Sequence, residues 1–264
     1  MSRSQITFLD EGFIAFDSVA FNAEMVRLEQ FFCESLAGSL AALSLGEYSI
    51  KGFEDGRRLL PALRDYPEEF GAFYDKLKLS NALKAVFLNS DFCEKIAAIL
   101  GCKPSHIGTV GEMFRIDFPE DGKRRLGWHQ DNAYYQLNKN PGAGAVAWIP
   151  LHDVDEVDGA LQIIRGSHHN GLIAPSFVSA SAGESAERIE IEISGLGCDV
   201  VEHLVAKTYS LNLLHLNLIH SSGFNRSDLP RLTIGVRVFD LSDSGFCGGT
   251  VSLKSKLNSL RERG

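Results

Sequence analysis

Apolar residues in the first hundred positions recur every three or four residues, which is the spacing of one face of an α-helix. We expect Asn22 to cap a first helix, whose apolar face is formed by Met25, Leu28, Phe32, Leu36 and Leu40. Pro67 fits the first turn of a second helix, which carries on one side Phe70, Phe73 and Leu77. Ser90 is expected to cap a third helix over residues 92–100, which ends at Gly101.

Beyond Gly101 the pattern changes to short apolar or alternating runs separated by Gly, Pro and Asp. Such runs predict short β-strands of a sandwich or barrel. The expected strands are 106–117, 126–131, 144–152, 160–164, 188–193, 209–218 and 232–241. Helices followed by strands predict an α+β fold with the helices segregated to one side of a sheet. The segment 166–187 is the longest expected loop, and it either covers a pocket or forms a surface insertion.

Composition narrows the function classes. The chain has 264 residues, 44 % of them hydrophobic, which is enough for one sizeable domain. Its net charge of −8 argues against nucleic acid or an anionic membrane as the main partner. The five cysteines are scattered, without a CxxC pair, so we expect no disulfide framework and a reducing, cytoplasmic setting. Neither a secretory signal nor an apolar run of the roughly 20 residues needed to span a bilayer is visible.

The run Trp128-His129-Gln130-Asp131 carries the strongest chemical signal. A histidine and a carboxylate two residues apart share a face if the segment is a strand, because side chains alternate along a strand. His129 and Asp131 would then supply two of the three ligands of a 2-His-1-carboxylate triad, which is typical of non-haem Fe(II) oxygenases. His220 is the best candidate for the third ligand, since it ends a long apolar run, whereas His215 is expected to serve packing.

Arg231 follows His220 across a turn-rich segment, and we expect a hairpin to bring the two onto neighbouring strands. There Arg231 would either hold a carboxylate through its guanidinium fork or make an ordinary salt bridge. Thr233 shares the face of Arg231 and can donate a hydroxyl hydrogen bond to the same anion. Trp148, on the strand over 144–152, either flanks the bound ligands or packs in the core.

The chain resembles the phytanoyl-CoA dioxygenase family over about residues 110–240. The resemblance lies in His129-Gln130-Asp131, in the block from Asp158-Gly159 to Gly166-Ser167-His168, and in His220-x-Ser222 with Asn225 and Arg231. It implies an Fe(II)- and 2-oxoglutarate-dependent oxygenase on a double-stranded β-helix of the jelly-roll or cupin-like type, with N-terminal and flanking helices.

Particular residues acquire expected roles from this resemblance. It implies iron on His129, Asp131 and His220, and the distal carboxylate of 2-oxoglutarate on Arg231, helped by Ser222. With O₂, the expected reaction hydroxylates a small molecule and releases succinate and CO₂. Related halogenases replace the carboxylate ligand by a small residue, so Asp131 favours hydroxylation. Arg115 matches only roughly a family position that touches the co-substrate, and a salt bridge at the rim is its expected role.

We expect a single domain over 1–264, divided into a mainly helical part (1–104), a β-helix core (105–243) and a C-terminal tail (244–264). Two other functions stay open at this stage. One is a cupin-like metalloenzyme that does not use 2-oxoglutarate, and the other is a non-catalytic jelly-roll binding module. The identity of the substrate and the oligomeric state do not follow from the residues.

Overall fold

The computed structural model describes residues 1–17, 20–43, 48–122, 125–135, 138–178, 188–194 and 200–247. Its helices are α1 (Arg3–Glu11), α2 (Asn22–Ala42), α3 (Phe53–Leu59), α4 (Pro67–Leu79), α5 (Asn81–Phe87) and α6 (Ser90–Leu100). Short 3₁₀ turns are η1 (Leu60–Leu63), η2 (Pro104–His106), η4 (Asp131–Tyr134), η5 (Pro141–Ala143) and η6 (Ser167–Asn170). The strands are β1 (Phe13–Phe16), β2 (Ile107–Asp117), β3 (Gly144–Pro150), β4 (Leu161–Ile163), β5 (Ser176–Val178), β6 (Arg188–Glu190), β7 (Glu202–Leu204), β8 (Leu211–His215), β9 (His220–Ser221) and β10 (Arg231–Asp240).

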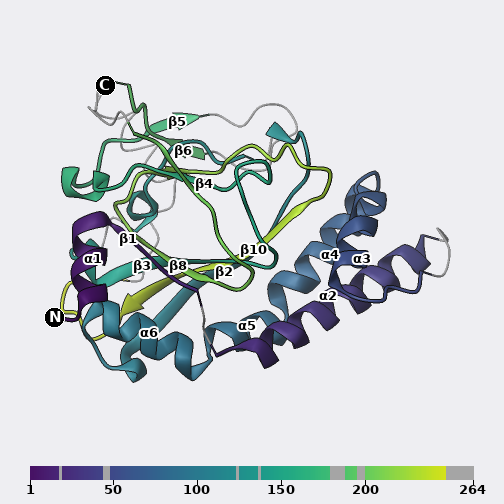
Figure 1. Ribbon diagram of the computed structural model, residues 1–264, viewed down its shortest axis with the longest axis horizontal. Helices are drawn as coiled ribbons and strands as arrows, with labels where there is room; N and C mark the ends of the chain where they lie inside the picture. The colour runs from purple at the N-terminus through teal and green to yellow at the C-terminus, as the bar shows by residue number, and fades with distance from the viewer. Residues whose placement is uncertain are drawn as a thin grey trace.

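Two antiparallel sheets form the β core. The larger has the strand order β1-β8-β3-β10-β2, and the smaller has the order β7-β4-β9. Strands β5 and β6 pair separately. Figure 1 shows the helices gathered along one side of the β core, with β5 and β6 on the opposite side. The observed architecture is therefore α+β, as the pattern of helices followed by strands predicts, and its two antiparallel sheets fit the cupin-like core that the resemblance implies.

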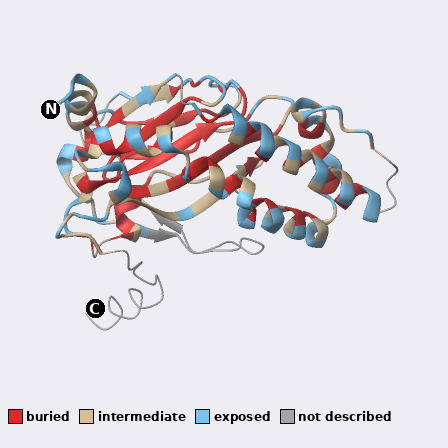
Figure 2. Cartoon of the chain, turned by 90° about the horizontal axis from the view of Figure 1, so that it is seen from below, coloured by how far each residue is buried: buried red, intermediate tan, exposed pale blue. Residues whose placement is uncertain are grey.

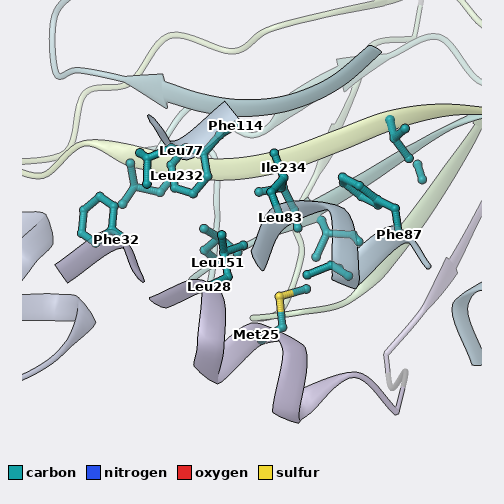
Figure 3. Close-up of a cluster of buried hydrophobic side chains, with 14 of the residues drawn as sticks. Met25, Leu28, Phe32, Leu77, Leu83, Phe87, Phe114, Leu151, Leu232 and Ile234 are labelled. Carbon is teal, nitrogen blue, oxygen red and sulfur yellow. The ribbon is translucent and has the colours of Figure 1, made fainter. Parts of the chain in front are cut away.

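The two faces of β10 explain how the layers are joined. Alternate residues of a strand point to opposite faces. On one face, Leu232, Ile234 and Val236 belong to a cluster of buried side chains shared with the helices, and Figure 3 shows Leu232 and Ile234 among residues of α2 such as Leu28. On the other face, Arg231 and Thr233 point between the two sheets. Figure 2 shows the same layering as buried strands beneath helices whose outer surfaces are exposed.

The helix predictions are confirmed in extent and wrong in two caps. Asn22 is the first residue of α2 and not its cap, because Phe21 precedes the helix and is fully buried, so packing anchors the start. Helix α6 begins at Ser90, and the side chain of Asn89 accepts the capping hydrogen bond from the Phe92 N–H at 3.2 Å. Gly101 ends α6 in the left-handed conformation (φ 78°), as expected.

Two expected strands are wrong. Residues 126–131 form a loop, in which His129 makes a single bridge to His220 before the turn η4. The expected strand 209–218 ends at His215, after which the chain crosses to the other sheet and continues as β9. Leu216 and Leu218 fill the space between the sheets during this crossing. The sequence gives no sign of this crossing, because the residues before, within and after it are all buried.

The expected loop over 166–187 is partly ordered into η6 and β5, while residues 179–187 lie outside the described part. Its return strand β6 leads to Ile191, whose N–H donates to the Trp128 carbonyl at 2.7 Å. The segment is thus attached next to His129. Most of the expected C-terminal tail, from residue 248, also lies outside the described residues. Among the residues that are described, no helix has the length and apolarity needed to cross a membrane.

Candidate metal and co-substrate site

Three side chains predicted from the sequence converge between the sheets. The candidate ligand atoms of His129, Asp131 and His220 all lie within 4.8 Å of one another, and all three residues are buried. The Nε2 atom of His220 is 3.2 Å from Oδ2 of Asp131, and Nε2 of His129 is 4.0 Å from the same oxygen. Within the described ranges, no other group of His, Cys, Asp and Glu meets this condition. Two imidazoles and one carboxylate are the donor set of a facial triad.

Backbone carbonyls orient both imidazoles. Nδ1 of His129 lies 2.8 Å from the Gly127 carbonyl, and Nδ1 of His220 lies 2.9 Å from the Leu218 carbonyl. Because a carbonyl only accepts, each Nδ1 carries the proton, and each Nε2 keeps its lone pair for the site. The two residues also exchange backbone hydrogen bonds of 2.9 and 3.1 Å. This bridge fixes the separation of the rings without a regular strand at His129.

Gln130, between the two ligands of the motif, is a structural residue that the sequence prediction missed. Its side chain is fully buried. Its Nε2 donates to the carbonyls of Gly171 and Asn217 at 2.8 and 2.7 Å, and its Oε1 accepts from the Ile173 N–H at 2.8 Å. Gln130 therefore ties the motif to the crossing before His220 and to the start of the segment that leads to β5.

Burial and neighbouring charges keep His129 and Asp131 in the protonation states that a metal requires. Burial, with the adjacent His220, lowers the pKa of His129 to about 3, against a smaller opposing effect of Asp131. Burial alone would raise the pKa of Asp131, but Arg237 and the two histidines hold it well below its usual range. Neutral imidazoles and an ionised carboxylate are the forms that coordinate metal ions.

Arg231 reaches the same cavity from β10. It is 1 % exposed, and its Nη2 lies 2.8 Å from Oδ2 of Asp117. Its Nε and Nη1 are buried without a hydrogen-bond partner, and so is Oγ1 of Thr233. Buried donors are seldom left unpaired in native proteins, so this combination indicates an anion that the protein itself does not provide.

The sequence profile of the phytanoyl-CoA dioxygenase (PhyH) family matches residues 11–233, most of the chain. The chain belongs to this family. The PhyH family depends on Fe(II) and 2-oxoglutarate, which agrees with the expected cofactors and with the His-Asp-His cluster. A comparison with curated proteins finds no match.

Solved structures similar to this PhyH-family protein share its fold at low sequence identity. The non-haem monooxygenase ThoJ in a nickel complex is 16 % identical with a TM-score of 0.51, over 98 % of this chain and 94 % of its own. EvdO2 from Micromonospora carbonacea var. aurantiaca, complexed with 2-oxoglutarate, is 16 % identical with a TM-score of 0.53, over 92 % of this chain and 94 % of its own. EctD from S. alaskensis, with 2-oxoglutarate and 5-hydroxyectoine, is 13 % identical with a TM-score of 0.56, over 92 % of this chain and 77 % of its own.

The cavity of this PhyH-family protein is lined by the triad, by Ser222 and by the three arginines Arg115, Arg231 and Arg237. Its apolar lining consists of Met113, Leu126, Val146, Trp148, Leu161 and Leu214. Trp148 is 6 % exposed and belongs to the cluster between the sheets, so it lines the cavity and packs in the core at once. Ser222 lies beside the same cavity, with its N–H bound to the Leu126 carbonyl.

The expected hairpin from His220 to Arg231 is wrong. Strand β9, which holds His220, pairs with β4, whereas β10, which holds Arg231, pairs with β2 and β3. The two residues therefore face one cavity from opposite sheets. The intervening turn depends on Asn225, whose side chain donates to the carbonyls of Asp117 and Leu229 at 3.0 and 2.9 Å.

Two charged residues that pair with side chains of the cavity, Asp117 and Arg237, escaped the sequence prediction. Asp117 accepts from Arg115 through both of its oxygens, at 3.1 and 2.8 Å, as well as from Arg231. Arg237 contacts Asp131. The spacing of charged residues could have indicated Asp117 and Arg237. Asp117 is two residues from Arg115 on β2, and Arg237 is six residues from Arg231 on β10. Even separations put both members of each pair on one face.

Proposed function

We propose that the protein is an Fe(II)- and 2-oxoglutarate-dependent oxygenase that hydroxylates a small molecule and converts 2-oxoglutarate and O₂ to succinate and CO₂. The observation that carries this proposal is the unpartnered Nε and Nη1 of Arg231, beside the unpartnered Thr233 hydroxyl, in the cavity that holds the triad. A metal site alone does not require a buried cationic fork. A dicarboxylate chelating a metal at one end needs such a fork at its other end.

In this proposal His129, Asp131 and His220 hold the iron, which when bound supplies the redox chemistry of O₂ activation. Arg231 and Thr233 bind the distal carboxylate of 2-oxoglutarate, with Ser222 beside it, and Trp148 forms a wall that excludes water. Asp117 keeps the Arg231 guanidinium in place by accepting from Nη2. Asp131 provides the carboxylate ligand, which favours hydroxylation over halogen transfer.

The helical part and the β part of the chain pack together. We propose that residues 1–264 act as one domain, since the helices of 1–104 and the strands of 105–243 share one buried cluster that includes Leu28 and Ile234. We also propose a reducing, cytoplasmic setting. The described cysteines, namely Cys33, Cys93, Cys102 and Cys247, are free thiols, and this supports such a setting.

Ligand binding and turnover test the proposal. Mn(II) followed by N-oxalylglycine should raise the melting temperature of the protein in two steps, by mass action on the native state. Succinate release from 2-oxoglutarate under air should depend on Fe(II). Replacing His129 by Ala should abolish the metal step and succinate release, while the matched variant His106→Ala, on the surface turn η2, should retain both.

The outcomes also separate the other two functions. A metal shift without an N-oxalylglycine shift would favour a cupin-like metalloenzyme that uses no 2-oxo acid. The absence of both shifts under anaerobic, chelator-free conditions would favour a binding module. Full succinate release by the His129→Ala variant would refute the ligand assignment.

A further inference from the structure

The two oxygens of Asp131 have different neighbours. Oδ1 accepts from Nε of Arg237 at 2.7 Å and lies 2.6 Å from Nη2 of the same guanidinium. Oδ2 faces the Nε2 atoms of His220 and His129, at 3.2 and 4.0 Å. Two nitrogens of one arginine therefore bind the oxygen that points away from the histidines, and the oxygen that points toward them is left for a metal.

The fold holds the Arg237 side chain in this position. Arg237 lies in the middle of β10, paired with Val146 of β3 and Val110 of β2. Its remaining terminal nitrogen, Nη1, lies 3.2 Å from Sδ of Met113. The register of β2 and β10 shifts at this point, where Gly111 adopts a positive φ of 68°. A Cβ atom at Gly111 would lie 3.7 Å from Nη1, an ordinary contact distance, so it is the positive φ at this shift in register that favours glycine here.

Electrostatics reinforce the contact. The side chain of Asp131 is 2 % exposed and that of Arg237 is 16 % exposed, so the pair is screened only weakly by water. Breaking such a pair leaves a buried charge without its partner, which is strongly unfavourable. The carboxylate is thus oriented before any metal arrives, and its rotation about the Cβ–Cγ bond is restricted by two nitrogens on one oxygen.

We propose that Arg237 is a positioning residue that reserves Oδ1, so that Asp131 offers a metal ion one oxygen only. This inference rests on the function proposed above. A carboxylate that chelated through both oxygens would occupy one of the coordination positions that a facial triad leaves open. A facial triad leaves three positions and a 2-oxo acid takes two of them, so a second oxygen from Asp131 would leave one possible pair instead of three, and no position for O₂. Arg237 would therefore protect co-substrate binding more than metal binding.

Variants at Arg237 test this division. Arg237→Met removes the guanidinium and keeps an unbranched side chain, while Arg237→Lys keeps the charge and loses the fork. The matched control is Arg165→Met, because Arg165 holds Glu202 through a fork on the exposed surface, away from the cavity. The dissociation constants of Mn(II) for the apoprotein, and of N-oxalylglycine for the Mn(II) protein, are measured by calorimetry and Mn(II) electron paramagnetic resonance.

We expect Arg237→Met to bind Mn(II) at least as tightly as the wild type and to bind N-oxalylglycine about 10- to 100-fold more weakly, so that the loss usual for removal of a residue that orients a metal ligand falls on the co-substrate and not on the metal. Arg237→Lys should fall between the two, and Arg165→Met should match the wild type. Unchanged N-oxalylglycine affinity in Arg237→Met, or loss of Mn(II) affinity in a folded Arg237→Met protein, would overturn the proposal.

A direct measurement keeps the proposal testable if the variants fold poorly. A crystal structure of the wild-type protein with Mn(II) should show one oxygen of Asp131 on the metal and the other on Arg237. Both oxygens on the metal would refute the inference. If the wild type binds no Mn(II), the proposed function fails. If it binds Mn(II) and N-oxalylglycine but the Arg237 variants behave like the wild type, only the role of Arg237 fails.

Discussion

Arg231 and Asp117 form a buried ion pair that uses only part of the arginine. Nη2 of Arg231 lies 2.8 Å from Oδ2 of Asp117, while Nε and Nη1 have no partner. A guanidinium presents its donors in a rigid planar fork, so fixing one nitrogen determines where the others point. Asp117 therefore aims the free side of Arg231 into the cavity, and the pair acts as one unit toward an anionic ligand.

Replacing Arg231 by Lys should weaken 2-oxoglutarate binding. The lysine keeps the charge but cannot provide the fork, and hydrogen bonds to charged groups contribute roughly 1.5–3 kcal/mol. We expect the KM for 2-oxoglutarate in succinate release to rise roughly 10- to 100-fold. Arg165→Lys, on the surface, makes the same substitution outside the cavity and should leave KM unchanged. An unchanged KM in Arg231→Lys would show that the carboxylate binds elsewhere.

Asp117→Asn should destabilise the protein and weaken co-substrate binding together. Burial opposes the charge of Asp117, but Arg115 and Arg231 outweigh it and hold the pKa of this carboxyl below its usual range. Removing the negative charge from the buried Arg231 and the partly buried Arg115 should cost about 3–5 kcal/mol in the free energy of unfolding, measured by urea denaturation. Asp153→Asn breaks the exposed ion pair with Lys207 and should change the midpoint little. Equal effects of the two variants would contradict this account.

Acid should destabilise the metal-free protein through His215. Burial, with smaller effects of His168 and His169, lowers the pKa of His215 to about 4. The unfolded chain, with a pKa near 6.5, then binds the proton first as pH falls, so the free energy of unfolding decreases below about pH 6.5. The expected loss between pH 7 and pH 5 is about 2 kcal/mol.

Urea midpoints at the two pH values, with EDTA present, check this loss. His215→Gln keeps a hydrogen-bond acceptor for the Asn217 N–H and removes the titration, so its midpoint should fall less than that of the wild type. His129 also has a lowered pKa, but it contributes equally to both proteins. A parallel fall in both would locate the acid sensitivity at other groups.

Gly223→Ala should be destabilising because the backbone of residues 159–160 passes too close to Gly223 to leave room for a side chain. A Cβ atom there would collide with the carbonyl oxygen of Ala160 and lie 2.7 Å from the carbonyl carbon of Gly159. Neither atom can move as a flexible side chain would, and we expect a loss of about 1–3 kcal/mol or more in calorimetric or urea unfolding. Gly38→Ala, on the exposed face of α2 with nothing within 4 Å, should instead stabilise by up to about 1 kcal/mol.

Local periodicity predicted helices α2, α4 and α6, because each presents one apolar face to the core, and it did not predict α1, α3 and α5. Helices α2 and α4 appear where the spacing that includes Leu28 and Phe73 indicates, and α6 ends at the expected Gly101. The strands were harder to predict, because β8 and the following crossing are buried throughout. In such a run the polar residues Asn212, His215 and Asn217 are buried as well, so no exposed position marks the point, after His215, at which the chain leaves one sheet for the other.

In the candidate site, too, the sequence predicted which residues take part but not how the backbone brings them together. His129, Asp131, His220 and Arg231 were found from residue type and order, and they do meet in one cavity. Their backbone was mispredicted, since His129 lies in a loop bridged to His220 and Arg231 lies across from β9. Gln130 and Arg237 were missed because their partners lie at least 41 residues away along the chain, and so was the pairing of Asp117 with Arg231, 114 residues away. Long-range pairing of this kind leaves no local pattern.

The two faces of β10 give the helical part of the chain a second role. Leu232 and Ile234 rest on α2 and its neighbours, while Arg231, next to Leu232 and on the opposite face, points into the cavity. Truncation before residue 105 would expose to water the hydrophobic face of the strand from which Arg231 projects. The helices therefore cannot be removed without disturbing the candidate site, and the apolar face of α2 supports a cavity that α2 itself does not line.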